Sequence, residues 1–330
     1  MFSKFKNIFF SSEIMIIGAG GLGLALAAFL TIAKKNVVTI AKDNQYNRIT
    51  NQKGINFYSD LLNKKKEVFT NINLKRTNYT KKVDYIFICT RTPDLKSIIP
   101  IIEKCAKKDT LIIPVCNGFG VTEFLKTQLP NHNITTGYAY GPFFRNEKDG
   151  ILGIKQIGTF SGIYLGASTK EDYKKQEKMY KKLENIVKNV PLPIKVYEQN
   201  KILNESFKKH CLIAPFEITG LLYKKNMGEI LENKEASETM YSLLQDLVTF
   251  GERIGVINNN DFYEQVSKDY AFAAPDMRSR AENDINSHSI PEFYFQFFDT
   301  LKKAKELNIN LPSFEKIAPK LEHLKELCDC

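Results

Sequence analysis

The chain has 330 residues, of which 43% are hydrophobic and 25% are charged, and its formal net charge is +10. This length suits two domains, and the composition is ordinary for a globular protein. No apolar run reaches the roughly 18 residues of a transmembrane helix. Residues 1–12 end without a cleavage site of small residues, so we interpret them as a lead-in segment and not as a signal peptide.

The cysteines and the basic charge argue against two further classes of site. No Cys-x-x-Cys pair occurs, so neither a metal site nor a disulfide framework is indicated, and reduced cysteines in a cytoplasmic protein are expected. Cys328 and Cys330 lie in the terminal tail and receive no role. The lysines stand in pairs beside many glutamates, which is typical of solvated helix faces and not of a nucleic-acid surface. A basic surface instead favours an anionic cofactor and a carboxylate substrate.

The most informative motif is Ile-Met-Ile-Ile-Gly-Ala-Gly-Gly-Leu-Gly at residues 14–23. A short apolar strand leads into Gly18, Gly20 and Gly23, which fill the three positions of G-x-G-x-x-G, with Gly21 and Leu22 between them. Leu22 opens an apolar helix. In this pattern the glycines permit a tight turn, backbone approach to a pyrophosphate and close helix packing. The helix N-terminus offers unpaired N–H groups to the phosphates. We therefore predict a dinucleotide site.

Strand-like and helical segments alternate over the first half of the chain, which predicts a parallel sheet covered on both faces. From about Pro191 the pattern becomes helical. We therefore expect an N-terminal doubly wound, Rossmann-type α/β domain over residues 1–196 and an all-α substrate domain over residues 197–330, with the site in the cleft between them. The strands are expected near 14–17, 36–41, 54–57, 67–72, 83–89, 110–115, 134–138 and 191–197, and the later helices near 203–213, 227–231, 239–254, 262–270 and 293–306.

The end of the second strand indicates which cofactor binds. An acidic side chain there binds the ribose hydroxyls of NAD, whereas a basic one suits the 2′-phosphate of NADP. Lys42 occupies this place, Asp43 follows directly and Arg48 lies nearby. NADPH is therefore the expected cofactor, with Lys42 as the discriminating residue and Arg48 as a helper. Asp43 is the residue that argues for NADH.

Several landmarks of the chain resemble the ketopantoate reductase family, which reduces ketopantoate to pantoate with NADPH on the route to pantothenate. Besides the glycine motif, Val83–Arg91 resembles the family strand that ends in a lysine, with Arg91 in its place. Cys116–Gly120 resembles the Gln-Asn-Gly turn and keeps Asn117. We expect Asn117 to reach the nicotinamide ribose or the substrate, which makes it a candidate both for cofactor binding and for catalysis. Arg91 is expected to bind a phosphate of the cofactor or a carboxylate through two parallel hydrogen bonds.

The resemblance further implies a catalytic lysine on the first long helix of the second domain, but its register stays open. An ungapped count from Pro215 places it at Ser206 and leaves His210 as the alternative acid. Counts from Asn226 and from Tyr197 place it at Lys209 and Lys208. Lys209 and Lys208 are the preferred proton donors, because an ammonium group supplies both charge and a proton to a developing alkoxide.

The family's substrate-binding glutamate falls on Asp284, with Glu282 two residues earlier. Three readings remain open: a ketopantoate reductase, an NAD(P)-dependent enzyme of the same fold acting on another 2-keto acid, an opine or a polyol, and a nucleotide-binding relative without activity. The first is preferred. A keto acid is then the small-molecule partner, and a homodimer is an open alternative to a monomer.

Overall fold

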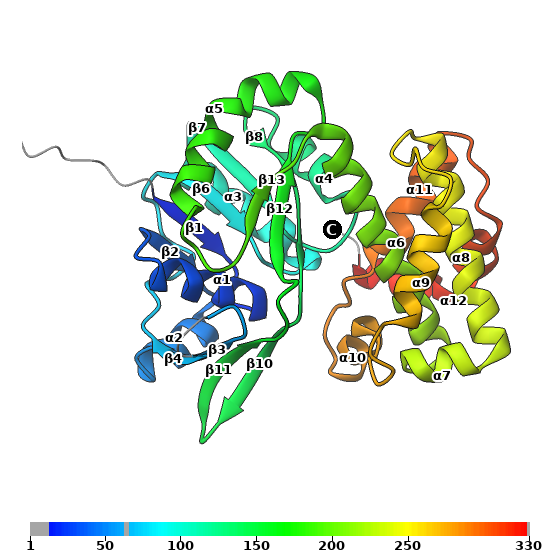
Figure 1. Cartoon of the computed structure of the whole chain (residues 1–330), viewed down its shortest axis with the longest axis horizontal. Coiled ribbons are helices and arrows are strands. Elements are labelled where there is room, and N and C mark those ends of the chain that lie inside the picture. The colour runs from blue at the N-terminus through cyan, green and yellow to red at the C-terminus, as the bar shows by residue number, and fades with distance from the viewer. Residues whose placement is uncertain (1–12, 63–65, 329–330) are drawn as a thin grey trace, which may run out of the picture.

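The computed structural model describes residues 13–62 and 66–328, so the lead-in segment and Cys330 lie outside the described residues. A part rich in strands is followed by a part made of helices (Figure 1). The last strand, β13 (Ile194–Val196), precedes α6 (Gln199–Tyr223), which crosses into the helical part. The expected fold class is therefore observed, and the domain division at residue 196 remains a prediction.

The central sheet contains six parallel strands whose carboxyl ends share one edge. They are β1 (Ile14–Ile17), β2 (Val37–Ile40), β5 (Leu74–Lys75), β6 (Val83–Ile88), β7 (Ala106–Pro114) and β8 (Asn133–Ile134). Their order is β5-β2-β1-β6-β7-β8, which is the doubly wound order with the chain reversal beside β1. Ligands of such sheets bind beyond the carboxyl ends at that reversal, where the glycine motif lies.

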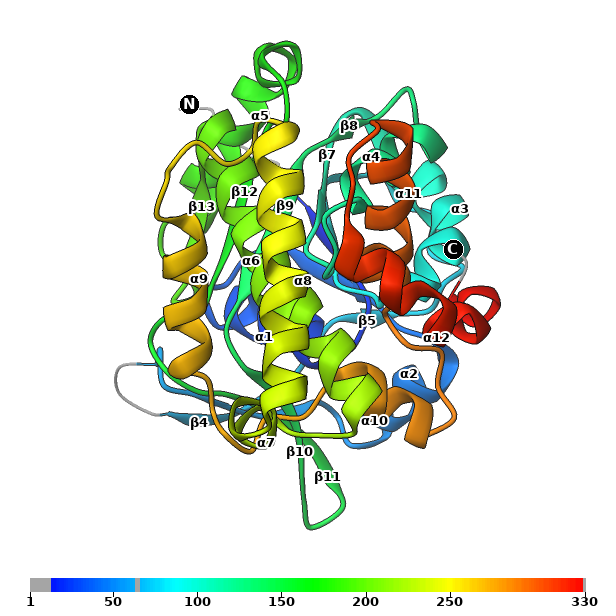
Figure 2. The same cartoon turned by 90° about the vertical axis from the view of Figure 1, so that its right-hand side faces the viewer.

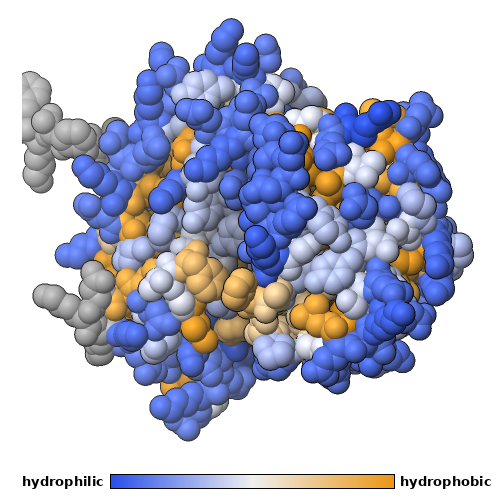
Figure 3. Space-filling model, turned by 45° about the vertical axis from the view of Figure 1, so that its right-hand side comes forward, coloured by the Kyte–Doolittle hydropathy of each residue, from blue (hydrophilic) through white to orange (hydrophobic). Residues whose placement is uncertain are grey.

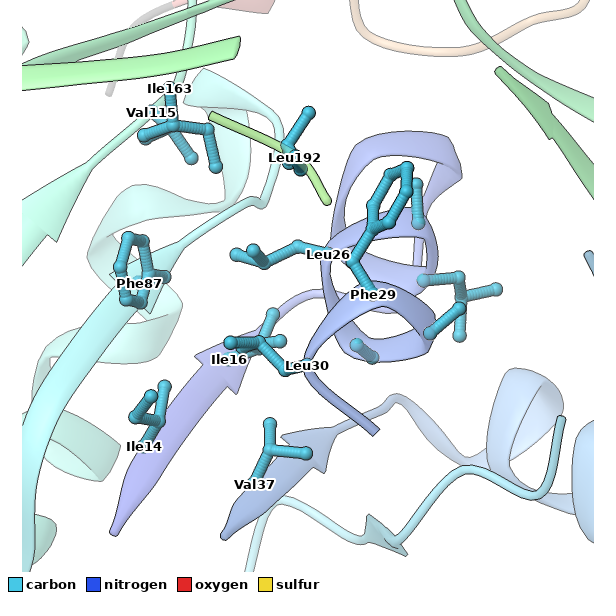
Figure 4. Close-up of a cluster of buried hydrophobic side chains, with 14 of the residues drawn as sticks. Ile14, Ile16, Leu26, Phe29, Leu30, Val37, Phe87, Val115, Ile163 and Leu192 are labelled. Atoms are coloured by element: carbon cyan, nitrogen blue, oxygen red, sulfur yellow. The ribbon is translucent and has the colours of Figure 1, made fainter. Parts of the chain in front are cut away.

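Helices cover both faces of this sheet. The helices are α1 (Gly21–Ile32), α2 (Asp43–Asn51), α3 (Leu95–Cys105), α4 (Val121–Gln128) and α5 (Lys170–Val187), with a 3₁₀ turn η1 at Thr92–Asp94. Ile14 and Ile16 of β1 point toward Leu26, Phe29 and Leu30 of α1 (Figure 4). Met15 and Ile17 alternate to the other face and join the core formed with α3 and α4. Because both faces of β1 are buried, all four of its residues are apolar.

Two smaller sheets flank the central one. One has the order β10-β11-β3-β4 and the other the order β13-β12-β9. The strands are β3 (Ile55–Ser59), β4 (Glu67–Thr70), β9 (Thr136–Tyr140), β10 (Phe143–Lys148), β11 (Ile151–Gln156) and β12 (Gly162–Gly166). The β10–β11 hairpin was not expected, because its charged outer residues hide the alternation typical of a strand. It places Phe143 against the start of α1.

The helical part packs around α6 and α8 (Figure 2). Its further elements are α7 (Met227–Glu232), α8 (Lys234–Arg253), α9 (Phe262–Ala271), α10 (Arg280–Asn286), a π-helical turn η2 (Tyr294–Phe298), α11 (Asp299–Glu306) and α12 (Pro312–Cys328). Two helices were not expected, the short α10 and the terminal α12. A sharp turn at Asn308, whose φ is 54°, separates α11 from α12.

The exposed side chains are mainly hydrophilic, and hydrophobic residues form separate patches on the face shown in Figure 3. Across the described segments, no helix is both long and apolar enough to cross a membrane. Four cysteines, Cys89, Cys105, Cys116 and Cys211, are free thiols.

Candidate functional site

Each glycine of the motif is required for a different geometric reason. Gly18 has a φ of 112°, and a Cβ there would lie 2.8 Å from the backbone of Cys89. A Cβ on Gly23 would lie 1.9 Å from the carbonyl oxygen of Gly18, so the helix can approach the strand only without a side chain. Gly20 differs, because nothing lies within 4 Å of the place where its Cβ would be. This open space at the start of α1 is where a pyrophosphate would approach the backbone.

The residues around this space fit a dinucleotide cofactor. Gly20 caps α1 without a side-chain hydrogen bond, so the first N–H groups of the helix remain available to phosphate oxygens. Gly21 lies against the carbonyl of Phe143, and Leu22 packs on the core. Arg145 of the hairpin donates a 3.2 Å hydrogen bond to the carbonyl oxygen of Ala19 in the same turn. Sequence reasoning missed Arg145 because it did not predict the hairpin.

The adenosine end of the site carries more charged groups than expected. Lys42 follows β2 and begins α2, and its ammonium lies 2.7 Å from Asp94. The carboxylate of Asp43 pairs with Arg76. Arg48 lies in the last turn of α2 and pairs with Glu147 of the hairpin at 2.7 Å. The structure thus separates Arg48 from the ion pair of Lys42.

The turn after β7 is shaped to meet the helical part. Gly118 has a φ of 117°, and a Cβ there would lie 2.5 Å from the Cβ of Phe295 in η2. A Cβ on Gly120 would lie 2.0 Å from the carboxylate of Asp299. The two glycines therefore allow the backbone on either side of Asn117 to approach η2 and α11. This close approach fixes Asn117 opposite α6.

Lys209 meets Asn117 across this contact. Its Nζ donates a 2.8 Å hydrogen bond to Oδ1 of Asn117, and its side chain is buried. The pKa of Lys209 is lowered from 10.5 to about 7, mainly by burial and also by the positive charge of Arg280, while the negative charge of Glu292 opposes both effects. A lysine with a pKa near neutrality can donate a proton and recover it at physiological pH. The pair joins two residues that the sequence predicted separately.

The two neighbouring candidates point elsewhere. Lys208 lies 3.0 Å from the carboxylate of Asp269 in α9. His210 is buried, contacts Thr300 at 3.2 Å between Nε2 and Oγ1, and has its pKa lowered to about 3 by burial. A group with that pKa is neutral at physiological pH and cannot supply the proton. The geometry therefore favours Lys209 among the three candidate acids.

The predicted residues Arg91 and Asp284 form an ion pair with each other. Their side chains lie 2.7 Å apart, and Arg91 also donates to the carbonyl oxygen of Ile290. Glu282 lies 3.5 Å from Arg278. The structure thus uses Arg91 and Asp284 to connect the loop after β6 with α10. It does not bring Asp284 or Glu282 into contact with Lys209.

Three residues near Lys209 were not predicted. Glu292 is half-buried, accepts a 3.0 Å hydrogen bond from the backbone N–H of Thr92, and acts electrostatically on Lys209. Burial raises the pKa of Glu292, and Arg280 opposes this shift. Arg280 forms no ion pair within 4 Å of an acidic side chain in the described parts of the chain. Gln296 is buried, and its Oε1 has no hydrogen-bond partner among the described residues.

Two of these residues share a feature of the sequence that could have pointed to them. Glu292 and Gln296 interrupt the otherwise apolar and aromatic run at residues 291–298, in which Gln296 belongs to the π-helical turn η2 and Glu292 lies two residues before it. Such turns are frequent at functional sites. Ser206, Lys209 and Gln296 line one small cavity with Asn117's neighbours Cys116 and Gly118. Its volume of ≈ 30 Å³ gives room for a water molecule beside the lysine.

Both halves of the chain match models of one protein family. Residues 14–170 match ketopantoate reductase PanE/ApbA, and residues 201–325 match the C-terminal part of the same family. The 2-dehydropantoate 2-reductase of Streptococcus pyogenes is 22% identical over 316 residues, which cover 95% of this chain and 97% of that protein.

Solved structures share the fold at low identity. The 2-dehydropantoate 2-reductase of Methylococcus capsulatus has a TM-score of 0.76 at 16% identity and covers 96% of this chain and 98% of its own. A D-mandelate dehydrogenase, solved in a ternary structure with NADH and anilino(oxo)acetate, has a TM-score of 0.78 at 17% identity. The match covers 96% of this chain and 100% of that one. The chain belongs to the ketopantoate reductase family, whose members are NADP-dependent oxidoreductases acting on a CH–OH group.

Proposed function

We propose that this protein reduces ketopantoate to pantoate with NADPH, in the cytoplasmic route to pantothenate, and that Lys209 is the proton donor. The observation that carries the proposal is the hydrogen bond between Lys209 and Asn117. It places a buried ammonium group where the two parts of the chain meet, beside the carboxyl edge of the sheet. Membership of the family supports the choice of substrate and cofactor.

In this proposal Lys209 and Asn117 have different roles in the reduction of a carbonyl group. Bound NADPH supplies a hydride to the carbonyl carbon. Lys209 stabilises the negative charge that develops on the carbonyl oxygen and then donates a proton to it. Asn117 accepts one N–H of the ammonium and thereby orients the remaining two donors.

Two further residues are assigned to substrate binding in this proposal. Arg280 has N–H donors that no described carboxylate occupies, so it suits the carboxylate of a keto acid. We assign the binding of a substrate hydroxyl to Glu292 and no longer to Asp284 or Glu282. The charge of Glu292 affects the pKa of Lys209, whereas the carboxylate of Asp284 is paired with Arg91.

A second candidate substrate is a 2-keto acid with an aromatic side chain. Phe119 and Tyr138 line the cavity beside Lys209. Tyr138 also stacks on Tyr164 with ring centroids 5.2 Å apart, so aromatic rings continue away from the cavity along β9 and β12. The D-mandelate dehydrogenase with the same fold was solved with anilino(oxo)acetate, which carries an aromatic ring.

A turnover assay separates these candidates. The oxidation of NADPH is followed with ketopantoate and, in parallel, with phenylglyoxylate and aliphatic 2-keto acids. Ketopantoate as the best substrate by kcat/KM supports the proposal. Preference for phenylglyoxylate supports the second candidate, and no turnover with any keto acid contradicts both.

We also infer that the protein forms a homodimer. A Staphylococcus aureus ketopantoate reductase of the same fold, with a TM-score of 0.74, is described as dimeric. Sedimentation-velocity ultracentrifugation tests this inference, and a mass equal to one chain at micromolar concentration would contradict it.

A further inference from the structure

Arg76 lies at the cofactor edge of the sheet, although the glycine motif gives no hint of it. Strand β5 pairs in parallel with β2, with Leu74 opposite Thr39 and Lys75 opposite Ile40. Arg76 is therefore the first residue beyond the carboxyl end of β5. It lies beside the same edge from which Lys42 follows β2. Groups at this edge of a doubly wound sheet face the bound ligand.

Three neighbours hold the guanidinium of Arg76 in place. One Nη pairs with the carboxylate of Asp43, and the other donates a 2.8 Å hydrogen bond to Oδ1 of Asn47. The guanidinium carbon lies 4.3 Å from the ring centroid of Tyr46, so the planar group rests on the ring. These contacts use two of the five N–H donors of an arginine and leave the others available. The guanidinium group is thus held in one orientation and still has free N–H donors for a ligand.

This arrangement changes the role of Asp43. A free carboxylate at the end of the second strand would bind the ribose hydroxyls of NADH. The carboxylate of Asp43 is instead engaged by Arg76. On the other side, Lys42 is held by Asp94 at 2.7 Å. Two cations, each paired with one carboxylate, therefore lie beyond the carboxyl ends of β2 and β5, at the edge where a doubly wound sheet binds the adenosine ribose.

We propose that Arg76, oriented by Asp43, Asn47 and Tyr46, is the second cation of a subsite for a ribose 2′-phosphate, opposite Lys42. The proposal rests on the NADPH dependence given above and adds the residue that sets its strength. An arginine with free N–H groups can bind a phosphate through two parallel hydrogen bonds, which a lysine cannot do. Arg76 therefore contributes more to the choice of NADPH over NADH than Lys42 does.

The experiment measures binding without turnover. Isothermal titration calorimetry is performed with 2′,5′-ADP and with 5′-AMP on the wild type, Arg76→Gln, Arg76→Lys and Arg253→Gln. Arg253 is exposed at the end of α8, so its variant loses the same charge far from the sheet edge. We expect Arg76→Gln to weaken 2′,5′-ADP at least tenfold and 5′-AMP by less than twofold. Arg76→Lys should lie between Gln and wild type, and Arg253→Gln should match wild type.

Each contrary result has a distinct meaning. Unchanged affinity of Arg76→Gln for 2′,5′-ADP, or equal weakening of both nucleotides, overturns the role of Arg76 alone. A wild type that binds 2′,5′-ADP no better than 5′-AMP overturns the subsite and the NADPH dependence together. Thermal unfolding of each variant shows whether it is folded, and Arg76→Lys carries the test if Arg76→Gln is not.

Discussion

The ammonium of Lys209 donates a 2.8 Å hydrogen bond to the side-chain oxygen of Asn117, 92 residues earlier in the chain. Asn117 follows a strand of the cofactor-binding sheet, and Lys209 lies in the first helix of the helical part. The contact requires glycine at position 118, where a side chain would collide with Phe295. The proposed proton donor is therefore held by a hydrogen bond between the two parts of the molecule.

The pH dependence of the reduction should follow Lys209. Burial lowers its pKa to about 7, so the ammonium form is lost as the pH rises through that value. We expect kcat/KM for the keto acid to be constant below pH 7 and to fall about tenfold per unit above it, because only the protonated form can donate. The reverse oxidation should gain rate over the same range. A flat profile for the reduction between pH 6 and about 9 would contradict this role.

Glu292 should set the pH above which kcat/KM begins to fall. Its negative charge raises the pKa of Lys209. The substitution Glu292→Gln removes the charge and keeps the shape, so the pKa of Lys209 should fall and the decline in kcat/KM should begin at lower pH. The matched control is Glu282→Gln, because Glu282 faces Arg278 and not Lys209. The hypothesis fails if both variants have the pH profile of the wild type.

Gly20→Val should remove cofactor binding and leave the fold intact. The backbone at Gly20 has φ −84° and ψ −170°, which valine adopts, and no atom lies within 4 Å of its Cβ position. The added side chain would fill the space that a pyrophosphate needs. Calorimetric titration with NADPH is the measurement, with thermal unfolding as the check of the fold. Wild-type affinity in the folded variant would contradict the nucleotide site itself.

Lys42→Ala should weaken NADPH selectively. Its ammonium is exposed and shares its charge with Asp94, so we expect the KM for NADPH to rise roughly tenfold and the KM for NADH to change little. Arg48→Ala should have a smaller effect, since Arg48 pairs with Glu147 instead. An equal rise for both cofactors would remove Lys42 from 2′-phosphate recognition.

The sequence predicted the cofactor half well because its signals are local. A glycine turn between a buried strand and a helix specifies its own geometry, and Gly18, Gly20 and Gly23 lie as expected. The β10–β11 hairpin and α10 escaped prediction because their stability depends on distant partners. Arg145 of the hairpin contacts Ala19, and Ser279 at the start of α10 donates a 2.8 Å hydrogen bond to the buried Glu217.

The sequence could not show which residue of α6 is the proposed proton donor, and the reason lies in helix geometry. Ser206 and Lys209 are three residues apart on α6 and share a face, so both line the same cavity. Lys208 is one residue away and faces Asp269. A shift of one residue rotates a helical side chain by about 100°, so only the contact with Asn117 distinguishes Lys209. The register counted from Asn226 agrees with this contact.

The most direct test of the account compares the three candidate acids by steady-state kinetics with NADPH and ketopantoate. Lys209→Ala should lower kcat by about a hundredfold or more, with NADPH affinity measured by calorimetry little changed. Lys208→Ala should keep kcat within about threefold of wild type, because its partner is Asp269. His210→Ala should lower thermal stability more than kcat, since His210 is a neutral buried group. If Lys209→Ala turns over at the wild-type rate, the proton comes from another group, and Lys209 is not the catalytic acid.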